Sequence, residues 1–393
     1  MKTYFLILMA WLIFSNVAFA FDQIELHDEK SRAGYWTSKN PSGENILLTN
    51  AEILEINASM IQHDLKSYPD QISVDEVREK ILQCPNKFSE VDSIPNNCDF
   101  EQITGEVLFA VTSEQAELRS IPDSAAKFQT IDPLIAVVVL AESIDCRFYF
   151  VESKDFAGWI DAGKVSFTDR ATWLKFYEPE NFLVVTSNKK FVPIGTSFGV
   201  WLRMGSKIPL ESLQKRSGRY RALVVFDVNQ HLNEIPVSIS DDESVSLGFL
   251  DCTENNLIRQ AFKYLGDDEV DSYELTSNIY RTVGIELPRN YRQEKLMPVQ
   301  INLTGAEEYD RLQRIFFARP GAIIYEPGHA MMYIGRDLNS PIVIHALDKY
   351  FTFDSGVREE NFVNRVIMSK LDFFNQREIN ALHFSTSICE LCK

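Results

Sequence analysis

Basic residues are scarce in this sequence, which has 39 lysines and arginines against 56 aspartates and glutamates. The formal net charge of −17 would repel a phosphate backbone or an anionic lipid surface, so we expect no nucleic-acid partner. The sequence has neither a glycine-rich phosphate loop nor a dinucleotide-binding fingerprint. Several histidines lack the spacing of metal ligands, namely His27, His63, His231 and His383. We therefore expect no cofactor and no bound metal.

Long apolar runs are absent after residue 21, where none approaches the roughly 20 residues that cross a bilayer. Residues 1–20 combine Lys2, an apolar stretch and the ending Val17-Ala18-Phe19-Ala20, which is typical of a removable export signal. An uncleaved membrane anchor is the alternative interpretation. After cleavage, we expect an exported protein, periplasmic or secreted, with no integral membrane segment.

Cysteine is also rare, and the six cysteines are Cys84, Cys98, Cys146, Cys252, Cys389 and Cys392. Cys84 and Cys98 flank a polar loop, so a disulfide between them is the expected bridge in an exported protein, with two free thiols as the alternative. Cys389 and Cys392 form a Cys-x-x-Cys pair at the end of the sequence. Because no helix can follow to lower their pKa, we expect a structural or incidental pair and not a redox or zinc site.

The composition is that of a packed globular protein, with 45% hydrophobic, 12% aromatic and 24% charged residues. At 393 residues the chain exceeds what one hydrophobic core usually organises, so we expect two to four domains after the signal. Residues 21–104 contain apolar residues at helical spacing and predict a helical N-terminal domain.

From residue 105 the hydrophobic pattern changes to a period of two, which predicts β-strands. Residues 105–170 carry five short strand patterns separated by polar turns, and residues 171–246 carry a second such set. This spacing predicts two small tandem β-barrels.

Residues 247–393 predict an α+β domain. One helix follows Thr253, a good N-cap, and a second follows Asp271. The segments PGAIIYEPGHAMMYIG and PIVIHAL, joined by the turn RDLNS, predict an antiparallel hairpin that carries His329 and His345.

These segments resemble the NlpC-type cell-wall peptidases, which are cysteine hydrolases with a papain-like α+β core. The matching strings in the last domain are ENNLIRQAFKYLG, SNIYRTVGIELPRN, PGHAMMYIG and VIHAL. Upstream, ELRSIPD, FVESKDFAGWI and FLVVTS resemble the SH3-like barrels of one multidomain branch, and ENILLTNAEILEINASM resembles its helical N-terminal domain. The resemblance implies a helical domain, two SH3-like β-barrels and an α+β papain-like (NlpC-type) domain.

Thiol hydrolysis needs a cysteine at a helix N-terminus, an imidazole that takes its proton and a polar group that orients the imidazole. The resemblance places the base at His329 and the orienting group at His345. It places the nucleophile at Ser272, where the family has a cysteine, and makes Asp271 and Tyr273 candidates for the substrate groove. A serine hydroxyl is far less acidic than a thiol and needs both base assistance and an oxyanion site.

The family usually has a Tyr-x-Trp-Gly-Gly stretch before the nucleophile, whereas this chain has only Asp267-Asp268-Glu269-Val270. The loss of both the thiol and the groove loop indicates a catalytically degenerate homologue that binds a peptidoglycan stem peptide, a muropeptide or a protein partner. One alternative is an active γ-D-glutamyl-diamino-acid endopeptidase of muropeptides that uses Ser272 with His329. Another assigns binding of the wall or a partner to the SH3-like barrels.

Overall fold

The computed structural model describes residues 28–60, 64–84, 97–123, 125, 127–196, 198–354, 357–374 and 379–392. The chain forms two compact units, each built from separate stretches of sequence. Unit 1 comprises Met1–Thr49, Cys252–Ser277 and Asn290–Lys393, and unit 2 comprises Asn50–Asp251 and Asn278–Arg289. The predicted signal at 1–20 lies outside the described residues. Among the helices that are described, none is long and apolar enough to cross a membrane.

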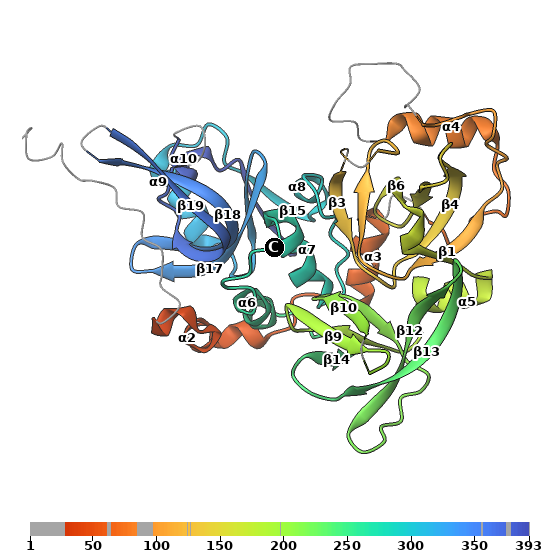
Figure 1. Cartoon of the computed structure of the whole chain (residues 1–393). Coiled ribbons are helices and arrows are strands. Elements are labelled where there is room, and N and C mark those ends of the chain that lie inside the picture. The colour runs from red at the N-terminus through yellow and green to blue at the C-terminus, as the bar shows by residue number, and fades with distance from the viewer. Residues whose placement is uncertain are drawn as a thin grey trace, which may run out of the picture. The chain divides into compact units, whose positions relative to one another are not determined.

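Unit 1 is built on a six-stranded antiparallel sheet with the spatial order β15-β20-β16-β17-β18-β19 (Figure 1). The strands are β15 (Val299–Asn302), β16 (Ile323–Glu326), β17 (His329–Asp337), β18 (Ser340–Asp354), β19 (Val357–Lys370) and β20 (Ser387–Glu390). β17 and β18 form the predicted hairpin, with His329 at the start of β17 and His345 within β18. The hairpin therefore brings both histidine positions to adjacent strands.

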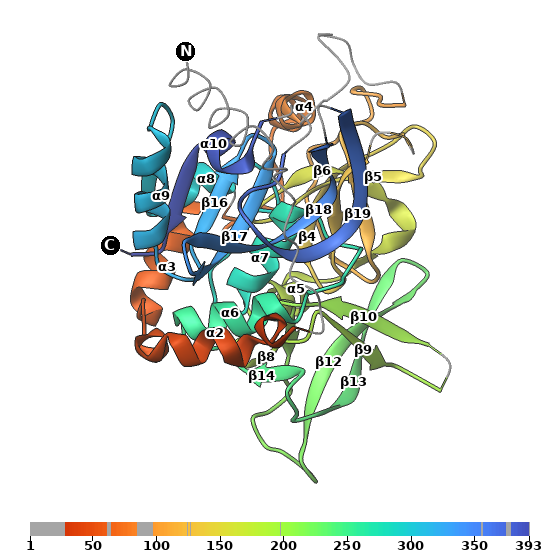
Figure 2. The ribbon, with the colours of Figure 1, turned by 90° about the vertical axis from the view of Figure 1, so that its left-hand side faces the viewer.

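The helices of unit 1 have local causes in the sequence. α6 (Glu254–Phe262) starts where predicted, because the Thr253 side chain accepts a hydrogen bond from the backbone N–H of Asn256. α2 (Ala33–Lys39) runs beside α6 (Figures 1 and 2). The remaining elements are the 3₁₀ turns η1 (Glu29–Ser31) and η2 (Pro41–Glu44), the helices α8 (Gln293–Leu296), α9 (Glu308–Phe317) and α10 (Ala381–Phe384), and the first part of α7 (Ser272–Arg281).

The core of unit 1 lies between the sheet and α9. Alternate residues of neighbouring strands point to this side, as expected from the period of two in a strand. Its fully buried members include Ile324, Met331, Val343 and Ile388 from the sheet and Ile315 from α9. This packing fixes the register of β17 and β18, because a slip by one residue would turn the apolar side chains out of the core.

The described part of unit 2 forms three sheets. The largest has nine strands in the order β12-β13-β7-β1-β4-β5-β6-β2-β3, and the others have the orders β11-β8-β14 and β10-β9. The strands are β1 (Leu108–Thr112), β2 (Ala116–Arg119), β3 (Lys127–Ile131), β4 (Ala136–Glu142), β5 (Phe148–Glu152), β6 (Ala157–Asp161), β7 (Val165–Phe167), β8 (Phe182–Val185), β9 (Lys189–Pro193), β10 (Gly199–Arg203), β11 (Lys207–Pro209), β12 (Arg219–Val228), β13 (His231–Ser240) and β14 (Val245–Leu247).

Unit 2 also has the helices α3 (Asn50–Met60), α4 (Val74–Gln83) and α5 (Arg170–Tyr177), and a 3₁₀ turn, η3 (Ala162–Lys164). The strand-period analysis did not predict α5, which lies between the two predicted strand sets. Asp169 caps this helix, and the buried Trp173 donates from Nε1 to the carbonyl of Val137 at 2.9 Å and stacks on Tyr177. Aromatic burial and capping therefore outweigh the short length of this helix.

The prediction of a mixed α+β chain with several sheets is confirmed. Tandem closed barrels are not found among the described strands, because β13 pairs with β7 through His231 and Phe167 and so joins the two predicted sets in one sheet. The SH3-like assignment and the boundaries at residues 104, 170 and 246 stay predictions.

Candidate active site

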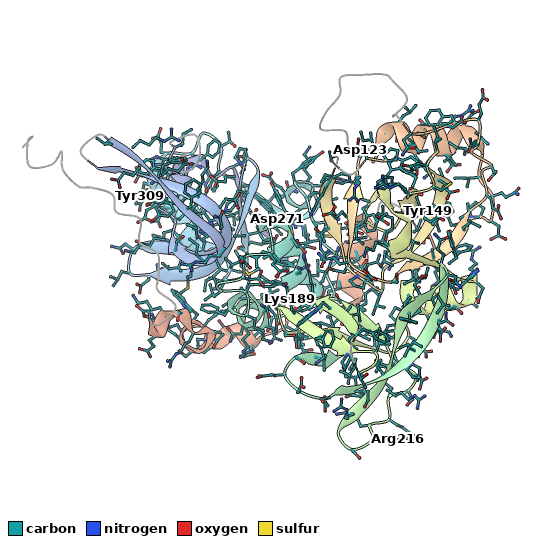
Figure 3. All side chains as sticks on the ribbon, viewed as in Figure 1. Asp123, Tyr149, Lys189, Arg216, Asp271 and Tyr309 are labelled. Atoms are coloured by element: carbon teal, nitrogen blue, oxygen red, sulfur yellow. The ribbon has the colours of Figure 1, made fainter. Side chains whose placement is uncertain are left out.

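Ser272 is the first residue of α7, as the sequence predicted. The Asp271 carboxylate accepts a hydrogen bond from the backbone N–H of Glu274 at 2.8 Å, and the Asp271 carbonyl accepts one from Leu275 at 2.9 Å. Asp271 therefore caps this helix, and Figure 3 places it at the helix start. The cap puts Ser272 at the helix N-terminus, where an anionic group would be stabilised.

The Ser272 side chain lies against β17. Its Oγ accepts a hydrogen bond from the backbone N–H of Ala330 at 3.2 Å, and the residue is only 6% exposed. Ala330 directly follows His329 in β17. Between the described side chains of Ser272 and His329 there is no hydrogen bond, so the serine is held by the strand backbone and not by the imidazole.

The two histidines form a hydrogen-bonded pair. Nε2 of His329 lies 2.9 Å from Nδ1 of His345, and the rings meet edge-to-face at 76°. Nε2 of His345 lies 3.0 Å from Oγ of Ser369 in β19, and Phe373 stacks on the His345 ring at 5.0 Å. A relay Ser369–His345–His329 thus crosses three adjacent strands and orients His329 toward the cavity beside Ser272.

This relay has two possible proton arrangements. If His329 donates from Nε2 and His345 donates to Ser369, then Nδ1 of His329 is free to act as a base. If Ser369 donates to His345 and His345 donates to His329, then Nδ1 of His329 carries a proton and cannot act as a base.

Burial of Ser369 decides between the two arrangements. Ser369 is completely buried, and within the described residues the only hydrogen-bond partner of its hydroxyl is His345. A buried hydroxyl proton without an acceptor costs about 1–3 kcal/mol, so Ser369 donates to His345. In this arrangement His329 presents an N–H donor to the cavity.

The electrostatics of the pair oppose protonation. Burial lowers the pKa of His329 to about 4, and burial together with the neighbouring His329 lowers the pKa of His345 well below 6.5. Both imidazoles are therefore neutral at pH 7. A general base works best when its pKa lies near the operating pH, so His329 is a poor acceptor for a serine proton.

Ser272 and His329 share one cavity of about 380 Å³. Its lining residues, all in unit 1, are Asp271, Ser272, Glu326, Pro327, Gly328, His329, Ala346, Leu347, Asp348, Lys349, Phe373 and Phe384. The pairing of β18 with β19 is irregular between Leu347 and Lys349, because Asp348 lies opposite two residues of β19, Val363 and Asn364, so the bulge is in β19. The structure thus brings together Asp271, Ser272 and His329, whereas Tyr273 does not line this cavity.

The cavity is acidic. Asp271, Glu326 and Asp348 line it, and Lys349, the one lysine or arginine among its described lining residues, forms an ion pair with Glu360 at 2.5 Å. This balance disfavours a developing oxyanion and favours a cationic ligand group.

The short acidic loop before α7 forms backbone hydrogen bonds with β19. The backbone N–H of Gly266 donates to the Val366 carbonyl at 2.9 Å, and the N–H of Val366 donates to the Asp267 carbonyl at 2.7 Å. These bonds close the loop directly onto the sheet edge.

The surroundings of Tyr273 indicate a structural role. Burial raises the pKa of Tyr273 to about 12, and the negative charges of Glu294, Asp271 and Glu326 contribute less to this rise. Its carbonyl accepts a hydrogen bond from Gln293 Nε2 at 2.7 Å, and the fully buried Gln293 also accepts from Thr276 and Tyr325. Gln293 therefore supports the first turn of α7. Sequence reasoning missed it because an isolated glutamine in a short helix carries no pattern.

The described residues contain no group of three or more His, Cys, Asp or Glu that could hold a metal ion. Cys84 and Cys98 are both free and buried in the same core cluster of unit 2. The predicted bridge between them is therefore not formed in this structure, and the loop that it would close, 85–96, lies outside the described residues. Burial raises the pKa of Cys84 to about 12, and burial with Asp99 raises that of Cys98 to about 11.

Comparison with known proteins identifies the fold. No family model matches the sequence, and no curated protein matches it. The structure is similar to an NlpC/P60 endopeptidase from Photobacterium damselae subsp. piscicida, with a TM-score of 0.69 and 12% identity over 94% of this chain and 97% of the other. It is also similar to an NlpC/P60 family protein from Bacillus cereus ATCC 10987, with a TM-score of 0.52 and 13% identity over 72% of this chain and 100% of the other. The predicted NlpC resemblance is confirmed at the level of fold.

Proposed function

We propose that this protein is a non-hydrolytic relative of the NlpC/P60 peptidases that binds a peptide in the cavity beside Ser272. The observation that carries the proposal is the relay that ends at Ser369, because it makes His329 a hydrogen-bond donor and not a base. A donor that faces a cavity is suited to hold a ligand carbonyl. It is not suited to remove a proton from a serine.

The proposal is supported by the absence of a compensating charge. In a serine hydrolase, a carboxylate stabilises the imidazolium that forms when the serine is deprotonated. Here His345 occupies the orienting position, and its own low pKa disfavours positive charge beside it. The carboxylates that line the cavity also repel an oxyanion and so disfavour its formation.

The ligand class follows from the cavity and the fold together. An acidic cavity attracts ammonium groups, and a peptidoglycan stem peptide with a diamino acid carries them. The endopeptidase activity named for one structural neighbour is consistent with a stem peptide as the ligand. A protein partner that inserts a lysine side chain satisfies the same chemistry and is the alternative occupant.

An active endopeptidase that cuts the γ-D-glutamyl to diamino-acid bond is the second candidate function. The observation in its favour is the common cavity of Ser272 and His329, which would let a reacting carbonyl approach both. It requires the opposite proton arrangement of the relay.

A third candidate gives wall recognition to the predicted SH3-like part. Phe191 and Trp201 on β9 and β10 contact each other at 5.1 Å and are 43% and 58% exposed. Exposed aromatic rings of this kind are suited to stack on sugar rings of the wall. If Trp201→Ala loses binding to wall fragments and Asp271→Asn binds them as the wild type does, this candidate is favoured.

The deciding experiment incubates the purified protein with an L-Ala-γ-D-Glu-diaminopimelate peptide. Calorimetry measures binding, and mass spectrometry measures cleavage. We expect binding without cleavage. Cleavage that His329→Gln abolishes would overturn the proposal in favour of the second candidate, and absence of binding would redirect it to a protein partner. Export to the periplasm or medium belongs to this proposal, and signal removal is checked by N-terminal sequencing of the protein from cells.

A further inference from the structure

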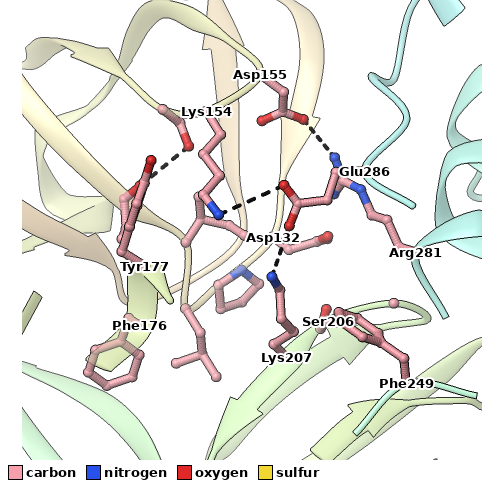
Figure 4. Close-up of a pocket in the computed structure, with 16 residues that line it drawn as sticks. Asp132, Lys154, Asp155, Phe176, Tyr177, Ser206, Lys207, Phe249, Arg281 and Glu286 are labelled. Carbon is pink, nitrogen blue, oxygen red and sulfur yellow. Dashed lines mark hydrogen bonds and ion pairs between the residues drawn. The ribbon is translucent and has the colours of Figure 1, made fainter. Parts of the chain in front are cut away.

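A second cavity, of about 90 Å³, lies entirely within unit 2 (Figure 4). Loops after β3 and β5, the start of β11 and the segment that follows α7 supply its walls. Gly205 allows these parts to approach, because its φ of +83° favours glycine and a Cβ there would lie 2.6 Å from Cβ of Arg281. The cavity has no residue in common with the one beside Ser272.

Lys154 points a poorly satisfied ammonium into this cavity. Its Nζ lies 3.8 Å from Glu286, beyond hydrogen-bond distance, and 4.5 Å from the ring centre of Tyr177. Among the described residues it has no hydrogen bond, although its side chain is only 21% exposed. Lys207 instead makes the close contact with Glu286, at 2.9 Å. Lys154 is thus available to a carboxylate or another acceptor.

Two residues that line the cavity each have a buried oxygen atom without a hydrogen bond. Oδ1 of Asp132 and Oγ of Ser206 have no hydrogen bond, and the two residues are 3% and 8% exposed. Asp132 is held as a carboxylate through its other oxygen by Arg289, while Arg203 lies 3.9 Å from Oδ1. Buried polar atoms without a hydrogen bond are rare in native proteins, and two of them on the lining of one cavity indicate that a polar molecule, water or a ligand, occupies it.

The charges select the kind of ligand. The lining carries three carboxylates, on Asp132, Asp155 and Glu286, and three cationic groups, on Lys154, Lys207 and Arg281. The lining carboxylates would repel a dianion such as phosphate, and the lining cations would repel a simple amine. A molecule that carries both charges satisfies both.

The volume limits the size of this ligand. A water molecule takes about 30 Å³, so the cavity holds about three waters or one molecule the size of glycine or alanine. We propose that this cavity binds a small zwitterionic α-amino acid. Its carboxylate accepts from Lys154, its ammonium donates to Oδ1 of Asp132, and the Ser206 hydroxyl completes the polar contacts.

The test titrates the full chain with glycine and with alanine by calorimetry and by thermal unfolding. We expect saturable binding and a rise in melting temperature with ligand concentration. Acetate and methylammonium carry one charge each and are the matched probes. Each should bind at least about tenfold more weakly, because it loses a hydrogen bond to a charged group.

Two variants locate the site. Ser206→Ala should weaken amino-acid binding by about tenfold, and Lys154→Met should weaken it at least as much while Lys207 keeps Glu286 paired. Ser113→Ala is the matched control, because Ser113 is also 8% exposed, has an unpaired Oγ and does not line this cavity.

Each outcome decides the proposal. Binding that falls in Ser206→Ala and Lys154→Met but not in Ser113→Ala supports it. Failure of glycine and alanine to saturate overturns it and leaves a water-filled cavity. Equal binding in all three variants also overturns it, because the ligand then sits elsewhere.

Discussion

Nε2 of His329 lies 2.9 Å from Nδ1 of His345, so the group at the base position is oriented by a second imidazole and not by a carboxylate. An imidazole can be a donor or an acceptor, whereas an ionised carboxylate only accepts. The direction of this hydrogen bond is consequently set one residue further away, by Ser369. The character of the site therefore depends on a residue in β19 that touches neither Ser272 nor the cavity.

The first prediction concerns the pH dependence of stability. Burial lowers the pKa of His329 to about 4, so the folded state binds fewer protons than the unfolded state between pH 6.5 and pH 4. Its contribution to stability is present above pH 6.5 and is lost as the pH falls toward 4, by at most about 3 kcal/mol. Urea unfolding measured at several pH values should show this slope, and His329→Gln should reduce it. An unchanged slope in the variant would contradict the prediction.

The second prediction concerns the protons of the relay. We expect nitrogen chemical shifts in NMR spectra to place a proton on Nδ1 of both His329 and His345 at pH 7. Ser369→Ala removes the donor that fixes this arrangement, so the variant should show a mixture of tautomers. A proton on Nε2 of His329 in the wild type would refute the assignment and would favour the hydrolase candidate.

The third prediction is that Ser272→Cys does not restore hydrolysis. A thiolate needs a positive neighbour, but His329 is neutral and the cavity is lined by Asp271, Glu326 and Asp348. The segment before α7, Asp267-Asp268-Glu269-Val270, is also shorter than the stretch that the resemblance leads us to expect there. Mass spectrometry of a muropeptide digest should show no product above the wild-type background. Clear turnover would mean that only the nucleophile has been lost.

Much of the fold was predictable from local patterns in the sequence. Thr253 and Asp271 mark helix starts that the structure confirms, because each caps its helix through its side chain. The hairpin of His329 and His345 was predictable from two apolar runs and a polar turn. α5 was missed because an eight-residue helix stabilised by Trp173 has too short a pattern to separate from its flanking strands.

The candidate site was predictable only in part. The resemblance supplied Ser272, His329 and His345, and the structure brings these residues close together, while their roles stay predictions. Ser369 and Asp348 were not found, because their positions depend on the register of β19 and on a bulge in that strand opposite Asp348. Strand register across a long hairpin depends on tertiary packing, which no local pattern in a single sequence encodes.

The fourth prediction separates the charge of Asp271 from its capping role. Asparagine caps helices nearly as well as aspartate, so Asp271→Asn should leave stability within about 0.5 kcal/mol of the wild type. Because it removes one of the cavity's negative charges, it should weaken binding of an ammonium-bearing stem peptide several-fold. Asp271→Ala is the comparison, and it should cost about 1 kcal/mol of stability as well. If the wild type and Asp271→Asn bind the peptide with equal affinity, the negative charge of the cavity does not contribute to binding.

The last prediction concerns when a bridge between Cys84 and Cys98 forms. Both thiols are buried, with pKa values of about 12 and 11, so they are almost fully protonated at pH 7 in the folded protein. Because the thiolate is the species that reacts, oxidation after folding should be slow, and the bridge should form during folding. Non-reducing peptide mapping should find the linked peptides in protein folded from the reduced chain with a glutathione redox buffer. Protein folded first under reducing conditions and then exposed to the same buffer should keep both thiols for hours. Rapid linkage in that folded protein would show that the buried state opens readily, and absence of linkage in both samples would show that the two thiols stay free.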